Sequence, residues 1–217
     1  MQPSDDQPLS IFTIGHSNHA LEHLLRLLAD HGIQSLVDVR SQPYSRYATH
    51  FNRADLEYAV KRQHIRYVFM GEELGGRPVG DEFYDAEEHV LYSRVAQASF
   101  FLTGIERLID EGALYRTAIL CSEENPTDCH RRLLIGRVLA GQEVVVRHIR
   151  GDGREQTEAD LQPMAAAPPA QQVSLWGEPE SAPPDQEATW RSVRPIPRRR
   201  AQPGAPTQGD EWGSEDF

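Results

Sequence analysis

The sequence predicts an α/β protein in which three layers are built around a mostly parallel sheet of about five strands. Short apolar runs of strand length alternate along the chain with segments whose apolar residues recur at helical spacing. Such alternation is typical of β-α-β units, because a crossover helix between two strands makes those strands parallel. Sheets of this kind carry helices on both faces, so three layers follow from the pattern.

The N-terminal half of the chain contains three predicted strands and two predicted helices. The strands are the apolar runs at residues 9–14, 33–39 and 65–70. A helix follows the first strand, because apolar residues recur at helical spacing from Leu21 to Leu28 and Gly32 provides a C-terminal stop. A polar and aromatic loop follows the second strand and leads into the second helix.

The next part of the chain contains two more strands, at residues 114–121 and 143–149. Residues 86–111 are predicted to be helical, as two segments that Gly112 closes. The last helix is predicted from Cys129 to Leu139, with Asp128 as its N-cap. Taken together, this order of elements predicts a Rossmann-like or flavodoxin-like sheet.

Composition divides the chain into an α/β domain, residues 1–162, and a tail, residues 163–217. The chain has 217 residues, of which 39% are hydrophobic, which is enough for one ordinary core. The tail is rich in Pro, Ala and Gln and is predicted to be disordered. The net charge of −11 argues against a bulk nucleic-acid coat. We expect no disulfide framework, signal peptide or membrane contact, and hence a cytoplasmic protein.

Polar residues collect where the predicted strands end. The carboxyl ends of parallel strands share one edge of the sheet, and ligands of such sheets bind beside that edge. Cys129, His130 and Arg131 fall in the first predicted turn of the last helix, where free N–H groups and the helix dipole favour an anion. The other candidate residues at this edge are Gly15, His16, Ser17, Asp38, Arg40, Cys121 and Glu123.

The two thiols allow several interpretations. Cys121 is either a buried packing residue, a nucleophile or redox thiol, or a metal ligand. No cofactor is predicted, because the spacing between Cys121 and the Cys129-His130 pair fits no common zinc pattern. Zinc or iron held by these three residues is the minority interpretation.

The other polar residues also have structural alternatives. His16 is either a general base or a residue of the turn that precedes the helix. Asp38 and Arg40 alternate along a strand and point the same way, which suits either a structural ion pair or a carboxylate that orients an anion-binding guanidinium. Arg131 is either a phosphate ligand or an exposed helix arginine.

Several landmarks together resemble a known family. They are residues 13–17 (TIGHS), 38–40 (DVR), the loop at 43–51, residues 74–76 (LGG), and Cys121 with the CHR triplet at 129–131. With these landmarks the chain from Leu9 to Leu161 is similar to the bacterial and archaeal family known as domain of unknown function 488. The resemblance implies an α/β domain with these residues at its site and implies no known reaction.

One motif stands in the tail, at residues 172–177 (QVSLWG). It resembles the peptide by which bacterial replication and repair proteins bind the DNA polymerase sliding clamp. Leu175 and Trp176 would fill apolar pockets, Gln172 would make a polar contact, and Ser174 is the small polar residue between them. The alternative is a stray apolar patch.

These observations lead to one functional hypothesis and two alternatives. The hypothesis is a cysteine-dependent enzyme of DNA repair or DNA modification, which the tail recruits and which acts on a base or nucleotide. Cys121 would be the nucleophile or transfer acceptor, while His16, Asp38 and Glu123 would handle protons and orientation. The remaining candidates, Gly15, Ser17, Arg40, Cys129, His130 and Arg131, would bind the substrate or its phosphate. The alternatives are a non-catalytic adaptor that binds nucleic acid or phosphate, and a thiol-redox or metal-binding sensor.

Overall fold

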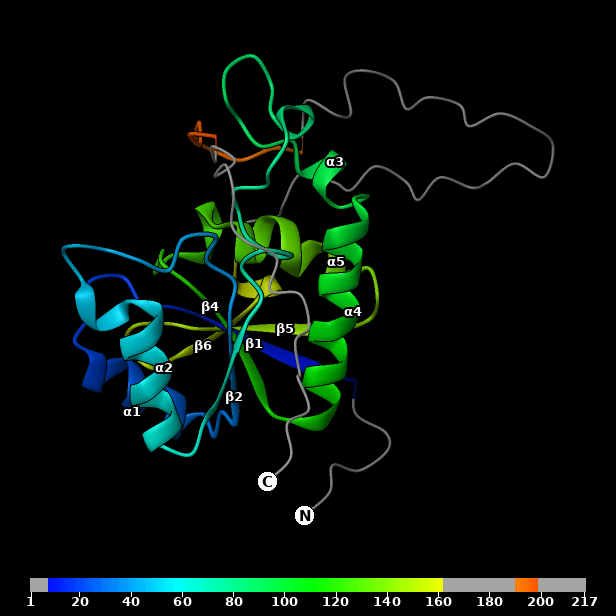
Figure 1. Ribbon diagram of the computed structural model, residues 1–217. Coiled ribbons are helices and arrows are strands. Elements are labelled where there is room, and N and C mark those ends of the chain that lie inside the picture. The colour runs from blue at the N-terminus through cyan, green and yellow to red at the C-terminus, as the bar shows by residue number, and fades with distance from the viewer. Residues whose placement is uncertain (1–7, 162–189, 199–217) are drawn as a thin grey trace, which may run out of the picture.

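The computed structural model describes residues 8–161 and 190–198, and within them six strands form one sheet (Figure 1). The strands are β1 (Ser10–Gly15), β2 (Ser35–Asp38), β3 (Arg66–Phe69), β4 (Thr117–Cys121), β5 (Val145–Ile149) and β6 (Glu155–Thr157). All neighbours are parallel except β5 and β6, which pair antiparallel. The α/β class and the five predicted strands are confirmed. The sixth strand was not predicted, because its three residues are all polar and show no apolar pattern.

The strands lie in the order β3-β2-β4-β1-β5-β6. β4 therefore separates β1 from β2, whereas the first two strands are neighbours in Rossmann and flavodoxin sheets. The order arises because β3 pairs with one edge of β2, and the chain then crosses β2 so that β4 pairs with its other edge, between β2 and β1. The strand order thus differs from the Rossmann-like or flavodoxin-like order that the sequence led us to expect.

Helices cover both faces of the sheet. They are α1 (Leu21–Asp30), α2 (Arg53–Arg62), α3 (Tyr92–Val95), α4 (Ser99–Leu114) and α5 (Arg137–Ala140). Figure 1 shows α1 and α2 on one face and α4 and α5 on the other. The side chains of β1 alternate accordingly: Phe12 and Ile14 belong to the apolar core that includes α1 and α2, and Ile11 belongs to the core that includes α4. Within the described residues, no helix combines the length and apolar character that a membrane span requires.

The helices between β3 and β4 differ from the prediction for residues 86–111. α3 begins only at Tyr92, because Leu91 still forms a β-bridge. α4 runs past Gly112, which was expected to close it. An added Cβ at Gly112 would lie 3.2 Å from Ile11 Cγ1, so this glycine allows close packing of α4 on the sheet and does not end the helix.

The predicted N-cap at Asp128 is wrong. Pro126–Asp128 form a short 3-10 turn that follows Asn125, whose side chain accepts a backbone N–H of that turn. Cys129 is extended, and a π-helix, Arg131–Gly136, then leads into α5. The physical reason is that the Asn-Pro pair starts a turn of its own before Asp128.

The segment Trp190–Arg198 packs against the domain, and we call it the C-terminal strap. The indole N–H of Trp190 donates to the Leu133 carbonyl at 2.7 Å, and the Arg137 guanidinium carbon lies 4.4 Å from the indole ring centre. Arg191 forms an antiparallel β-bridge with Leu91. Trp190 thus serves as an apolar anchor, which the average composition of the tail conceals.

The strap lies within the stretch, residues 163–217, that the sequence analysis separates from the domain at 1–162. The strap belongs to the folded domain, although the residues that join it to Leu161 lie outside the described residues. The clamp-binding-like motif at 172–177, with Gln172, Ser174, Leu175 and Trp176, also lies outside them.

Candidate functional site

The candidate site lies at the carboxyl edge of the sheet, between β1 and β4. Gly15 at the end of β1 is in register with Cys121 at the end of β4. From here the chain after β1 continues to α1 on one face, while the chain after β4 continues to α5 on the other (Figure 1). This divergence of two adjacent connections opens the crevice in which α/β sheets bind ligands.

Gly15 allows the loop after β4 to pass directly over the end of β1. A Cβ built on Gly15 would lie 1.7 Å from the Glu123 carbonyl oxygen, so no other residue fits at this position. The backbone N–H of His16 donates to the Cys121 carbonyl at 3.0 Å, and that of Ser17 donates to the Ser122 carbonyl at 2.8 Å. These contacts fix the loop that carries Glu123.

Four side chains converge in what we call the thiol cluster: Cys121, Glu123, Cys129 and His130. Their potential ligand atoms all lie within 4.8 Å of one another. The thiols of Cys121 and Cys129 donate to the same Glu123 Oε2, at 2.7 Å and 3.2 Å. His130 Nδ1 lies 3.6 Å from Cys121 Sγ and 3.9 Å from Cys129 Sγ. Both cysteines are free thiols.

The cluster shifts the acidity of its own members. Burial raises the pKa of Cys121 well above its usual value, and the neighbouring Cys129 adds to this effect. Burial also opposes ionisation of Cys129, but hydrogen bonding from Cys121 and the charges of Arg131 and His130 outweigh it and lower the pKa of Cys129 below its usual value. For Glu123, the thiol donors and the imidazole likewise outweigh burial and lower the pKa to about 2. Cys129 is therefore the more acidic of the two thiols, and the Glu123 carboxylate to which both thiols donate is ionised at pH 7.

A second group at the edge holds Arg40 in place. Arg40 donates to both carboxylate oxygens of Asp38, at 2.9 Å from Nε and 2.6 Å from NH2, and to His16 Nε2 at 3.0 Å. Tyr67 donates its hydroxyl to Asp38 Oδ2 at 2.7 Å. Burial and the nearby Arg40 charge lower the pKa of His16 to about 4, so this imidazole is neutral at pH 7. Its Nδ1 faces the Ser17 carbonyl, so both ring nitrogens are engaged.

A cavity of about 650 Å³ lies over the thiol cluster. Among its lining residues are Arg40, all four members of the cluster, and Ser192–Ile196 of the strap. Arg77 and Arg194 add two exposed guanidinium groups to the lining. NH1 and NH2 of Arg40 each keep one N–H that makes no hydrogen bond to a described residue. Together with the guanidinium groups of Arg77 and Arg194, these N–H groups give the cavity several donors for an anion.

Some of the predicted site residues lie elsewhere. Arg131 is fully buried and donates to the Thr13 hydroxyl and to the carbonyls of Glu123 and Glu124, so it supports the loop and does not line the cavity. Asp38 is also fully buried, and like His16 it orients Arg40 without lining the cavity. Ser17 lies in a separate hollow beside Arg150.

Sequence reasoning missed the contribution of the strap and of Arg77. The strap is remote in sequence from the strand ends, so no local pattern links it to the cavity. Tyr67 was missed because its hydroxyl reaches Asp38 across neighbouring strands, a contact that depends on the register of β2 and β3.

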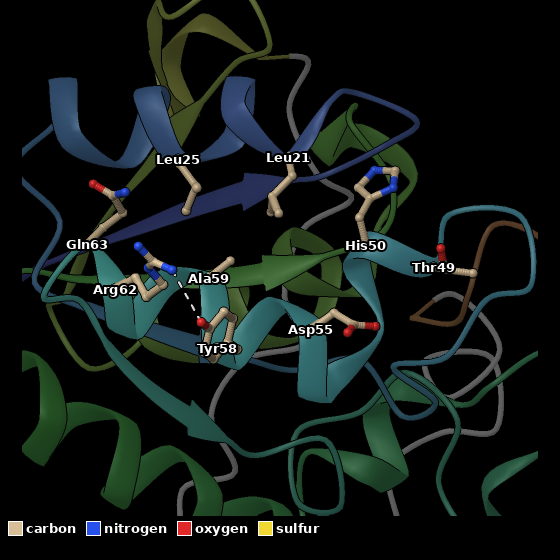
Figure 2. Close-up of a pocket in the computed structure, with 9 residues that line it drawn as sticks. All are labelled: Leu21, Leu25, Thr49, His50, Asp55, Tyr58, Ala59, Arg62 and Gln63. Atoms are coloured by element: carbon tan, nitrogen blue, oxygen red, sulfur yellow. Dashed lines mark hydrogen bonds between the residues drawn. The ribbon is translucent and has the colours of Figure 1, made fainter.

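A second cavity, of about 610 Å³, lies between α1 and α2 (Figure 2). Its lining includes Leu21, Leu25 and Tyr58, and Arg62 donates to the Tyr58 hydroxyl within it. It contains none of the thiol cluster or of the groups around Arg40. The thiol cluster and Arg40 therefore share the cavity at the carboxyl edge of the sheet and not this one.

Comparison with known proteins gives one match. Comparison with curated proteins found no match, and comparison with solved structures found none. The family model described as domain of unknown function DUF488 matches residues 20–138. This range contains Asp38, Arg40 and the whole thiol cluster, whereas Gly15, His16 and the strap lie outside it. Because the match spans more than half of the sequence, the chain belongs to the DUF488 family.

Proposed function

We propose that this protein is an enzyme of DNA repair or DNA modification. It acts on a base or nucleotide that binds in the cavity over the thiol cluster. The observation that carries the proposal is the convergence of Cys121, Glu123 and His130 beside a cavity that also contains Arg40. Reactive and anion-binding groups thus meet in one space at the switch point of the sheet.

The cavity suits an anionic substrate of nucleotide size. Its volume is within the usual range for small-molecule sites. Arg40 is held by two hydrogen bonds to Asp38, so its guanidinium is oriented before a ligand arrives and loses little entropy on binding. Arg77 and Arg194 would contact the outer part of the same ligand.

The geometry changes the roles assigned to individual residues. Cys121 and Glu123 supply the reacting groups, since both line the cavity. Arg40 replaces Arg131 as the anion-binding arginine, because Arg131 is enclosed by protein groups. His16 and Asp38 act through Arg40, whose position they fix.

Recruitment to DNA is the second part of the proposal and rests on the motif at residues 172–177. Leu175 and Trp176 would anchor this segment on the sliding clamp, and Gln172 and Ser174 would make its polar contacts. The enzyme would then work where the clamp encircles DNA.

The proposal is tested with Cys121→Ser on a panel of nucleoside phosphates and of oligonucleotides that carry damaged or modified bases. We expect turnover of a competent substrate to fall by at least about 100-fold, because the reacting sulfur is lost. Thr103→Ser, on the exposed side of α4, is the matched control and should leave turnover unchanged. Circular dichroism checks that both variants fold.

Arg40→Gln separates binding from chemistry in the same assay. We expect it to raise KM for phosphorylated substrates more than it lowers kcat, because Arg40 contacts the anion and not the reacting atoms. Equal turnover by wild type and Cys121→Ser would remove the thiol cluster from the mechanism, and the proposal with it.

A further inference from the structure

We infer that the thiol cluster is a divalent metal site, with zinc held by the sulfurs of Cys121 and Cys129 and by His130 Nδ1, and with the Glu123 carboxylate as a fourth and exchangeable ligand. The inference deepens the proposed function, since it names the cofactor of the same site. Metal binding itself does not depend on that function being correct.

The donor atoms match zinc in type. Two thiolates, an imidazole nitrogen and a carboxylate oxygen are ligands that zinc accepts, and thiolates select it over calcium or magnesium. The sequence spacing fits no common zinc pattern because the ligands come from two different places. Cys121 ends β4, whereas Cys129 and His130 precede the π-helix.

The distances between the imidazole and the sulfurs fit a tetrahedral shell. Zinc lies about 2.3 Å from sulfur and about 2.0 Å from nitrogen, so a tetrahedral site places a nitrogen and a sulfur about 3.5 Å apart. His130 Nδ1 lies 3.6 Å from Cys121 Sγ and 3.9 Å from Cys129 Sγ. The imidazole nitrogen therefore already lies at nearly the separation from each sulfur that the ion requires.

His130 has the tautomer that metal binding needs. Its Nε2 lies 3.3 Å from the Val39 carbonyl, and because a carbonyl only accepts, Nε2 carries the proton. Nδ1, which faces both sulfurs, is then the ring nitrogen that a metal ion would bind in place of a proton. An N–H donated to a backbone carbonyl is the usual outer contact of a metal-binding histidine.

Glu123 completes the shell from the cavity side. The side chain is exposed, unlike the two cysteines, and its Oε2 already contacts both sulfurs. A carboxylate in this position can leave the ion and return, so the fourth position would open toward the cavity. Three fixed protein ligands and one exchangeable position are the arrangement of catalytic zinc sites.

Zinc content tests the inference directly. The untagged full-length protein, purified under reducing conditions, is stripped with a chelator and then titrated with zinc, and its metal content is measured by elemental analysis and native mass spectrometry. We expect about one zinc ion per chain, with a Kd tighter than about 1 μM. Binding of cobalt in place of zinc should give a thiolate-to-metal charge-transfer band.

Three variants assign the ligands. Cys129→Ser should weaken zinc binding by at least about 100-fold, and Glu123→Gln by about 10-fold with the stoichiometry retained. His89→Gln is the matched control, because His89 belongs with Asp85 and Glu87 to a second cluster of possible ligands. Since Glu123 is exposed, its variant should fold even if Cys129→Ser does not.

The outcomes separate the metal site from the proposed function. Absence of zinc binding by the reduced wild type, or loss of zinc only in His89→Gln, overturns the metal site and leaves a thiol enzyme possible. Zinc binding that needs Cys129, in a protein that turns over no nucleotide or base, keeps the metal site and removes the proposed function.

Discussion

At the scale of single residues, the gathering of polar side chains at the strand ends could be predicted, but the partners of the charged groups could not. Arg131 was a reasonable anion ligand by its place in the sequence. In the fold its guanidinium instead donates to the carbonyls of Glu123 and Glu124, which the turn after β4 directs inward. Which carbonyls lack a donor depends on how two loops cross, and local sequence does not contain that information.

A buried network around Glu158 sets the stability of the molecule in acid. Glu158 accepts from His148 Nε2 at 2.8 Å and from Arg132 Nε at 2.9 Å. Burial would raise the pKa of Glu158, but these two partners outweigh it and keep the pKa below its usual value. A carboxylate with a lowered folded pKa stabilises the fold above its unfolded pKa, and this contribution is lost as the pH falls through the folded pKa.

Glu158→Gln should therefore lower the free energy of unfolding at pH 7 by about 2 kcal/mol, because hydrogen bonds to a charged group are lost. The difference from wild type should shrink as the pH falls from about 5 toward 3. Urea unfolding over this range measures it. Glu106→Gln, on the exposed side of α4, controls for the change in net charge. If the difference in unfolding free energy between wild type and Glu158→Gln stayed constant over this pH range, Glu158 would not be the group responsible.

At the scale of elements, hydrophobic periodicity predicted the five main strands and the segments that are helical. It did not predict that Arg131–Gly136 is a π-helix. Periodicity reports which residues are buried, and a short apolar segment is compatible with either helix type. The π-helix begins directly after His130, in keeping with the tendency of π-helical turns to occur beside functional groups.

The glycine-rich loop after β3 leaves room for the His130 ring. A Cβ built on Gly76 would lie 2.8 Å from His130 Nδ1, so Gly76→Ala must displace the ring from the two sulfurs. We expect zinc affinity to fall by about 10-fold or more, with the fold retained. Zinc titration measures the change.

Gly141→Ala is the matched control for Gly76→Ala. The nearest atom to its added Cβ is a carbonyl oxygen at 3.3 Å, within the helix that ends there, and it lies away from His130. Equal zinc affinity of Gly76→Ala and Gly141→Ala would show that His130 Nδ1 is not a ligand.

At the scale of the whole molecule, composition could not indicate that Trp190 and the residues after it pack on the domain. The average composition of the strap resembles that of the sequence around it. The contacts of one indole with Leu133 and Arg137 are nevertheless enough to attach the strap to the domain. The family match also ends before the strap, so neither observation linked it to the cavity.

The proposal that the tail recruits the protein to the sliding clamp gives a prediction for the full-length chain. A Leu175→Ala, Trp176→Ala double variant should lose binding to the sliding clamp, because its two apolar anchors are gone. Val173→Ala, which changes a neighbouring residue of the motif, should retain binding. Surface plasmon resonance with immobilised clamp measures both variants, and undiminished binding by the double variant would exclude the motif.

The strap has a consequence for how such a partner would be held. Leu161 and Trp190 both lie on the domain, so the stretch of chain that contains the motif is tethered to the domain at both ends. Since an extended chain spans at most about 3.5 Å per residue, Gln172 can move no farther than roughly 40 Å from Leu161. A bound clamp would thus remain within about one domain diameter of the cavity, and the DNA inside it would meet the enzyme at a high effective concentration.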